Sequence, residues 1–356
     1  MARKSRRKPA RRKPRKRKWQ PRWASWPDER LLKLRLKDLK LPLRGTWLAA
    51  CLRELNGELA EKGLRRVRAH GWISSEWFSP SDTPGIAFPF YLAHPRLMRL
   101  ERKMIIDVEG GTHAECMRIL RHEAGHALDN AYGLRRRQQR REVFGSPSEP
   151  YPEFYTPKPY SKSYVLHLDS WYAQSHPDED FAETFAVWLS PASEWRQRYA
   201  GWPALRKLEY MDRLMGSIRH QPARLENSAE IDSLAQQRKT LRQHYRTKRR
   251  HYGVDHPNFY DRDLRRIFSD APEHAANPTA AQFIARIRRP VRRAVAGWTG
   301  IYQYTIDRVI EEMAARCREL KLRLPGSEEH ARQEFTVLLT VQAMNYLHSG
   351  GHRLFL

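Results

Sequence analysis

The sequence comprises 356 residues, with 66 lysines and arginines against 40 aspartates and glutamates, which gives a formal net charge of +26 at pH 7. Its length is typical of one large domain or two to three ordinary ones, and its 40% hydrophobic content excludes a wholly disordered chain. The longest apolar stretch, near residues 335–344, falls far short of the ~20 residues that a membrane-spanning helix needs, so we expect no transmembrane segment.

The cysteines and the N-terminus bear on the cellular compartment. Three widely spaced cysteines form no CxxC pair, which argues against a disulfide framework. No apolar core follows the basic N-terminus, so we expect no secretory signal peptide. Both observations favour a cytoplasmic protein.

Residues 1–22 hold thirteen lysines and arginines and no acidic residue, which is half of the net charge. Because this segment has almost nothing to bury, we predict a disordered basic tail over residues 1–27. Through residues 1–22 it would attract a polyanion, either nucleic acid or an anionic surface, and Trp19, Trp23 and Trp26 could stack on exposed bases. No sequence-specific nucleic-acid motif accompanies the tail, so a solubilising or targeting arm is the alternative.

The segment from residue 28 to residue 107 combines helical and strand-like patterns. Apolar spacing predicts helices over 28–40 and 46–62, although the leucines near residue 34 also alternate as in a strand. Short β-branched and aromatic runs predict strands at 72–73, 86–91 and 104–107.

From residue 112 onward the chain reads as mainly helical. Thr112 and Glu115 have the spacing of a capping box, which predicts a helix to about Tyr132, ended by Gly133. Residues 134–176 predict a long loop, and loops of this length inside a domain are often functional. Further helices are predicted at 178–189, 236–250, 279–296, 300–320 and 327–348.

The first helix after residue 112 carries the motif His122-Glu-Ala-Gly-His126. Its two histidines stand four residues apart, so both imidazoles project from one helix face and can share a zinc ion. Glu123, beside them, can take a proton from a water on the metal. The competing interpretation is an ordinary helix with two surface histidines. Gly125, which costs ~1 kcal/mol inside a helix, suggests that a neighbouring segment approaches closely.

A two-histidine zinc hydrolase needs a third protein ligand. The metzincin pattern is excluded, because Asp129 and Tyr132 stand where it requires glycine and histidine. The later segment Asp178–Glu183 offers Glu179 and Glu183, which share a helix face. We assign Glu179 as the ligand and Glu183 as the carboxylate that holds a ligand histidine by its other ring nitrogen. Alternatively, these acidic residues only complement the helix dipole.

The stretches His122–Tyr132 and Glu179–Phe185 together resemble the gluzincin metallopeptidases. The resemblance is greatest to the catalytic domain of the anthrax lethal factor type and to bacterial sequences described as zinc-binding metallopeptidases. It implies a zincin-like domain with one Zn²⁺ per chain on His122, His126 and Glu179, with Glu183 behind the site. It also implies that a tyrosine seven residues before the ligand glutamate, Tyr172, faces the oxyanion.

Several assignments remain open between alternatives. Tyr160 and Tyr164 compete with Tyr172, and Asp180 stands where the resembled family usually has a bulky apolar residue. His176 suits a transition-state donor, a competing ligand or a plain loop residue. Asp129 could orient a ligand imidazole or cap a neighbouring backbone. The strand at 86–91 could pair with an extended substrate, although Pro89 would limit this pairing.

The sequence therefore predicts a mostly helical α+β fold and a zinc metallopeptidase that hydrolyses protein or peptide substrates, with Glu123 as the general base. The basic tail would localise it, in association with nucleic acid. The alternative is a nucleic-acid-associated or structural protein with a degenerate metal site. We expect a tail, a zincin-like domain, a basic helical connector and a C-terminal helical region at 1–27, 28–202, 203–254 and 255–356.

Overall fold

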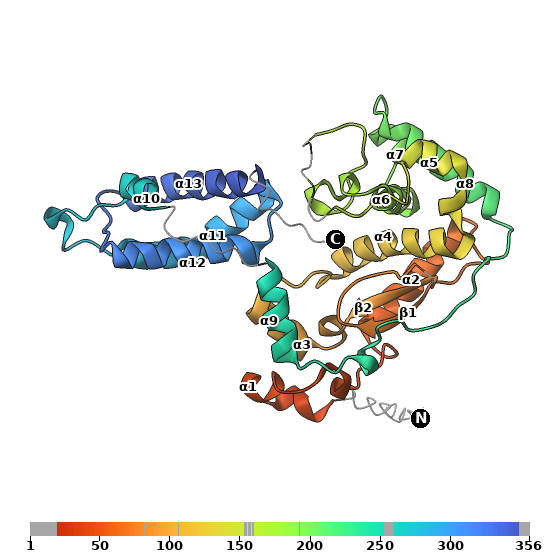
Figure 1. Ribbon diagram of the computed structural model, residues 1–356, viewed down its shortest axis with the longest axis horizontal. Helices are drawn as coiled ribbons and strands as arrows, with labels where there is room; N and C mark the ends of the chain where they lie inside the picture. Colours follow the sequence, from red (N-terminus) through yellow and green to blue (C-terminus); the bar gives the residue numbers. More distant parts are fainter. Residues whose placement is uncertain are drawn as a thin grey trace, which may run out of the picture.

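The computed structural model describes residues 20–81, 83–105, 107–152, 155, 158, 160–191, 193–252 and 260–348. Over these residues the protein is mostly helical with a small two-stranded parallel sheet, as predicted for the fold class (Figure 1). No helix in the described part of the chain is long and apolar enough to cross a membrane.

The buried apolar side chains of the described residues form two clusters. The first extends along the chain from Trp23 to Tyr245 and the second from Tyr260 to Ala343. Figure 1 shows the second cluster as a group of helices beside the rest of the molecule: α10 (Asp261–Ile267), α11 (Ala280–Thr299), α12 (Gln303–Glu319) and α13 (Glu328–His348). The predicted connector contributes buried residues to the first cluster, among them Leu208 and Tyr245. The predicted domain boundaries stay a prediction.

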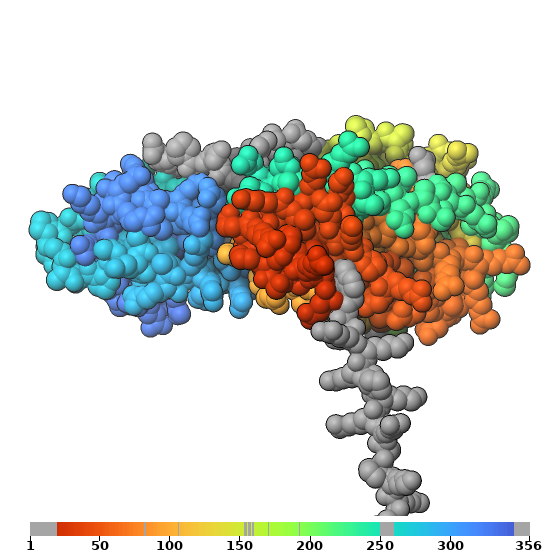
Figure 2. Space-filling model, turned by 90° about the horizontal axis from the view of Figure 1, so that it is seen from below, coloured from red at the N-terminus to blue at the C-terminus, as the bar shows by residue number. Residues whose placement is uncertain are grey.

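The N-terminal residues that the structure describes pack on the first cluster. Trp23, in a short 3₁₀ helix at Arg22–Ser25, is buried, and its indole N–H donates to the Leu39 carbonyl at 3.1 Å. Trp26 is half-buried, with the Arg30 guanidinium 3.9 Å from its ring centroid. The red segment in Figure 2 lies against the molecule accordingly. Trp23 is therefore not available to stack on bases, contrary to our expectation, and Arg30 covers one face of Trp26. Residues 1–19, with Trp19, lie outside the described residues.

Two elements predicted between residues 28 and 107 differ in the structure. The helix predicted over 28–40 is interrupted after α1 (Asp28–Leu31), because the next residues pair with a distant segment: the Leu36 N–H donates to the Lys239 carbonyl at 3.0 Å. In place of the strand predicted at 104–107, Met104 and Ile105 end helix α3 (Pro95–Ile105), since Ile105 continues the buried stripe of that helix; Ile106 lies outside the described residues. Helix α2 (Trp47–Glu61) matches its prediction.

The sheet lies inside the first cluster and pairs β1 (His70–Ser74) with β2 (Gly85–Pro89) in parallel. Every residue of β2 is buried. The other edge of β2 is also occupied, because the Ala87 N–H donates to the Phe78 carbonyl at 2.9 Å. The predicted pairing of a substrate with the strand at 86–91 therefore finds no open edge at Ala87.

Two long helices pack across each other above the sheet. Helix α4 (His113–Tyr132) begins at the predicted capping box of Thr112 and ends at Gly133 in the left-handed conformation (φ 61°). Helix α6 (Pro177–Leu189) crosses it closely at Gly125, where a Cβ atom would stand 2.8 Å from Ala182 Cα. The close approach suggested by this glycine is thus confirmed.

The remaining helices support these two or form the second cluster. The predicted long loop contains helix α5 (Gln138–Phe144), whose Phe144 ring packs on Phe181. Helix α11 continues through Pro290. The other helices are α7 (Trp195–Arg198), α8 (Ala204–Ile218), α9 (Leu241–Tyr252), α10 (Asp261–Ile267), α11 (Ala280–Thr299), α12 (Gln303–Glu319) and α13 (Glu328–His348). Short 3₁₀ helices lie at Leu36–Leu39, Phe90–Ala93, Leu134–Arg136, Asp169–Gln174, Leu234–Gln236 and Pro272–His274.

The α4–α6 crossing yields a stability prediction. Gly125→Ala should lower the free energy of unfolding by about 1–3 kcal/mol, because the new methyl group meets backbone atoms of Ala182 that cannot rotate away. Gly216→Ala is the matched control: Gly216 is exposed inside α8 with no atom within 4 Å of its added Cβ, so it should gain up to about 1 kcal/mol. Urea denaturation of both variants measures the difference; equal midpoints would contradict the close-packing argument.

Candidate metal centre

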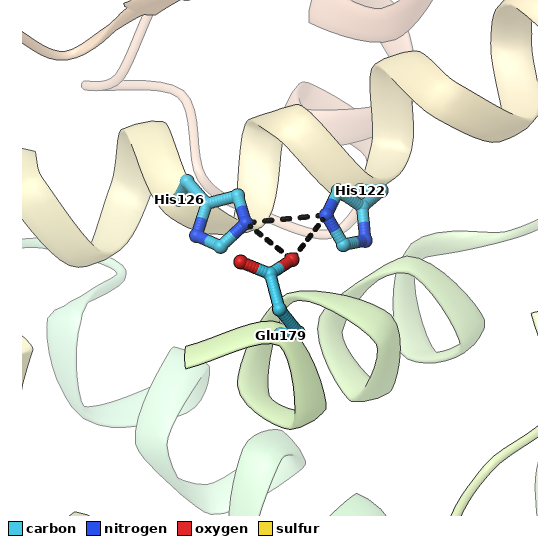
Figure 3. A group of neighbouring side chains, drawn as sticks. All are labelled: His122, His126 and Glu179. Carbon is cyan, nitrogen blue, oxygen red and sulfur yellow. Dashed lines mark hydrogen bonds and ion pairs between the residues drawn. The ribbon is translucent and has the colours of Figure 1, made fainter. Parts of the chain in front are cut away.

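The crossing of α4 and α6 brings His122, His126 and Glu179 together (Figure 3). Nε2 of His122 lies 3.1 Å from Nε2 of His126. Oε2 of Glu179 lies 3.0 Å from the first nitrogen and 3.2 Å from the second. Three potential ligand atoms from two helices therefore form a nearly equilateral triangle, and all three residues are buried.

This triangle fits a zinc ion. Tetrahedral ligands at about 2.0–2.1 Å from zinc are separated from one another by roughly 3.3 Å, close to the observed spacing. Two imidazoles and one carboxylate are also a donor set typical of catalytic zinc sites, which leave the fourth position open. The three atoms can thus bind one ion without rearrangement of the helices.

Glu183 fixes the orientation and tautomer of His122. Its Oε1 accepts from His122 Nδ1 at 2.8 Å, and its Oε2 accepts from the Leu168 backbone N–H at 2.8 Å. Because a carboxylate with both oxygens accepting keeps a proton on Nδ1, the neutral form of His122 directs the lone pair of Nε2 to the centre of the triangle. Glu183 thus holds His122 by the ring nitrogen that faces away from the triangle.

The electrostatics of the cluster favour a positive charge at its centre. Burial alone would lower the pKa of His122, but hydrogen bonds and charges from Glu179 and Glu183 raise it well above its ordinary value. Burial likewise opposes ionisation of Glu179, yet the two histidines hold the pKa of this carboxyl well below its ordinary value. The buried carboxylates therefore stabilise a cation among them.

Glu123 is buried next to the triangle and has a free oxygen. Its Oε2 has no hydrogen-bond partner within the described part of the chain. Burial raises the pKa of the Glu123 carboxyl, against the opposing effect of the two histidines. A buried carboxylate oxygen without a partner is costly, and this one lies beside the triangle, where a bound molecule could pair with it.

Of the three candidate tyrosines, Tyr172 lies beside His122. The centroids of the two rings are 5.5 Å apart, and burial raises the pKa of Tyr172 well above its ordinary value, so its hydroxyl stays protonated. Tyr160 is 81% exposed, and the ring of Tyr164 stacks under the Lys207 ammonium at 4.1 Å. The structure therefore brings only Tyr172 of these three to the metal centre.

Other predicted residues serve the start of α6 rather than the metal. His176 is the N-cap: its Nδ1 accepts from the Asp178 N–H at 3.1 Å, and its Nε2 donates to the Glu149 carbonyl at 2.9 Å. Both ring nitrogens are thus engaged with the backbone, in place of the ligand or donor role considered above. Asp180 points to Lys207 Nζ, 2.6 Å away, and burial raises the pKa of Asp180 to about 7.

Asp129 belongs to a buried ion-pair network that joins the two helices. Arg140, whose side chain is 0% exposed, donates to Asp129 at 3.0 Å and to Asp178 at 2.6 Å. Arg135 lies within 3.4 Å of the same two carboxylates. This linkage differs from both predicted roles of Asp129, the orientation of an imidazole and the capping of backbone. The sequence analysis missed Arg140 because one arginine among many carries no distinguishing signal.

The hydroxyl of Tyr151 is a second feature that the sequence analysis missed. It donates to Oε1 of Glu179 at 2.9 Å, the carboxylate oxygen that is not part of the triangle. No motif marks this tyrosine in the aromatic, proline-rich segment around it.

Comparison with known proteins supports a metal-binding function. Residues 116–199 match the model of a family described as "putative zinc-binding metallo-peptidase". The match covers less than half of the chain, but it includes both histidines of the site and its three glutamates, Glu123, Glu179 and Glu183. No curated protein and no solved structure matches the chain.

The ion-pair network yields a second stability prediction. Arg140→Met should destabilise the fold by about 3–5 kcal/mol, because it leaves two buried carboxylates with only the partly exposed Arg135 as partner. Arg196→Met is the control: its ion pair with Asp212 is exposed, so its loss should cost about 0–1 kcal/mol. Chemical denaturation monitored by tryptophan fluorescence compares the two. Equal losses would show that the Arg140 network is no stronger than a surface pair.

Proposed function

We propose that this protein is a zinc-dependent metallopeptidase with a gluzincin arrangement of ligands. The observation that carries the proposal is the triangle of His122 Nε2, His126 Nε2 and Glu179 Oε2, with the partner-free carboxylate oxygen of Glu123 beside it. The family match over residues 116–199 supports the same conclusion. The resemblance to the lethal-factor type gives the same division between ligand and supporting glutamate.

Each residue has a distinct role under this proposal. His122, His126 and Glu179 hold one zinc ion, and Glu183 keeps His122 in the ligand tautomer. When bound, zinc supplies a Lewis acid that lowers the pKa of a water molecule and polarises a peptide carbonyl. Glu123 accepts the proton of the attacking water and delivers it to the leaving amine nitrogen. The Tyr172 hydroxyl donates a hydrogen bond to the developing oxyanion.

Substitution of the base separates catalysis from metal binding. Glu123→Gln should retain about one zinc per chain but lose at least ~100-fold in peptidase activity, because the amide cannot accept the proton. Glu142→Gln is the matched control, since Glu142 is exposed on α5 and bonds Gln138. Zinc content is measured by atomic emission, and activity with a denatured-protein substrate library.

Two outcomes would contradict the proposal. If wild-type protein, purified without chelators, takes up no zinc, the metal centre is absent and the alternative of a degenerate site holds. If the Glu123→Gln variant cleaves as fast as wild type, then Glu123 is not the base.

The basic N-terminal segment supports a second element of the proposal, the localisation of the enzyme on a polyanion. It rests on the composition of residues 1–22 alone. The lysines and arginines of residues 1–22 would bind the phosphates of a nucleic acid, without sequence-specific contacts. The competing function, a nucleic-acid-associated protein without peptidase activity, would keep this binding and fail the zinc test.

Removal of the charged segment tests the localisation. Deletion of residues 2–18 takes away twelve lysines and arginines and leaves Trp23 and its packing in place. Affinity for random-sequence duplex DNA should fall, and the slope of log K against log salt should flatten by about 0.9 for each lost phosphate contact. A salt slope unchanged by the deletion would show that another surface binds the polyanion.

A further inference from the structure

The two carboxylate oxygens of Glu179 have different partners. Oε2 lies within 3.2 Å of both histidine nitrogens. Oε1 instead accepts the hydrogen bond of the Tyr151 hydroxyl at 2.9 Å. A phenol with an ordinary pKa of about 10 is protonated at neutral pH, so the hydroxyl is the donor. The carboxylate is thus held between the metal centre on one side and a loop residue on the other.

The ring of Tyr151 is fixed relative to α6. It stacks on the imidazole of His176 with ring centroids 3.8 Å apart and planes 12° from parallel. His176 is itself fixed, because it caps α6 through Asp178 and bonds Glu149. Tyr151, the donor, is therefore held by His176 at the start of α6, the helix that carries the acceptor Glu179.

The backbone around Tyr151 restricts its movement further. The turn begins at Gly145 (φ 101°), where a Cβ atom would stand 3.1 Å from the Pro177 ring, so only glycine fits easily. Pro150 and Pro152 flank Tyr151 and limit the backbone freedom that is lost on ordering. Tyr151 is nevertheless 47% exposed, so it is not a core residue whose burial alone explains its position.

We propose that Tyr151 is a positioning residue that restricts Glu179 to binding zinc through Oε2 alone. The inference rests on the proposed zinc site. A carboxylate with a free Oε1 can bind through both oxygens, and the second oxygen would then take the coordination position that a catalytic zinc keeps open. Hydrogen bonds to ligand side chains commonly change metal affinity by 10–100-fold, which sets the expected effect.

The test compares Tyr151→Phe with wild type in the full-length protein. The phenylalanine keeps the stack on His176 and removes only the donor. We expect zinc to bind about 10–100-fold more weakly in a competition titration with a coloured chelator, because the Glu179 carboxylate is no longer held in place before the metal binds. The visible spectrum of the Co²⁺-substituted variant should also change, because band intensity depends on coordination number. The melting temperature of the apo-protein should fall by no more than the loss of one hydrogen bond explains, a few degrees.

Matched variants make each outcome decisive. Tyr160→Phe removes the hydroxyl of an exposed tyrosine from the same region and should leave zinc affinity and the Co²⁺ spectrum unchanged. Wild-type values for Tyr151→Phe in both measurements would overturn the inference while the proposed function stands. Tyr151→Ala removes the ring stack together with the hydroxyl and is measured alongside. If only the alanine variant loses affinity, the ring stack and not the hydroxyl positions Glu179, which also overturns the inference. A wild type without zinc refutes the proposed function itself.

Discussion

The close contact between α4 and α6 is the constraint on which the metal centre depends. The two histidines come from one helix and the glutamate from the other, so their three ligand atoms meet only if the helix backbones nearly touch. Gly125 and Ala182 at the crossing make that distance possible. Gly125, between the two histidines, is therefore as necessary for the site as the imidazoles, although it has no side chain that could bind a metal.

The first turn of α6 shows how helix geometry distributes charge. Asp178, Glu179 and Asp180 are consecutive, so helical rotation sends their carboxylates in three directions. One meets the buried Arg140, one meets the histidines and one meets Lys207. The helix dipole stabilises all three, but each also has a specific cationic or imidazole partner. The alternative interpretation, in which these three acidic residues only complement the dipole of α6, therefore omits the specific partner that each carboxylate has.

The sequence predicted those features that depend on residues close together along the chain, and it did not predict those that depend on distant residues. The helix of the histidine motif, its capping box at Thr112 and the reason for Gly125 depend on spacing within a few residues, and the structure agrees with them. Arg140 and Tyr151 act through residues 11 to 38 positions away, and a sequence with many arginines and tyrosines gives no hint which one makes the contact. The failed strand at 104–107 and the interrupted helix after Leu31 likewise depend on tertiary partners.

The pairing of Leu36 with Lys239 has a consequence for any attempt to isolate the first cluster. This hydrogen bond joins the first residues of the first cluster to its last ones. The ion pair of Glu29 with Arg242 joins the same two segments. A fragment that ends at residue 202 would lose this pairing, and with it Lys207, the partner of the buried Asp180 next to Glu179. A fragment that keeps all of these contacts has to extend from Trp23 through α9.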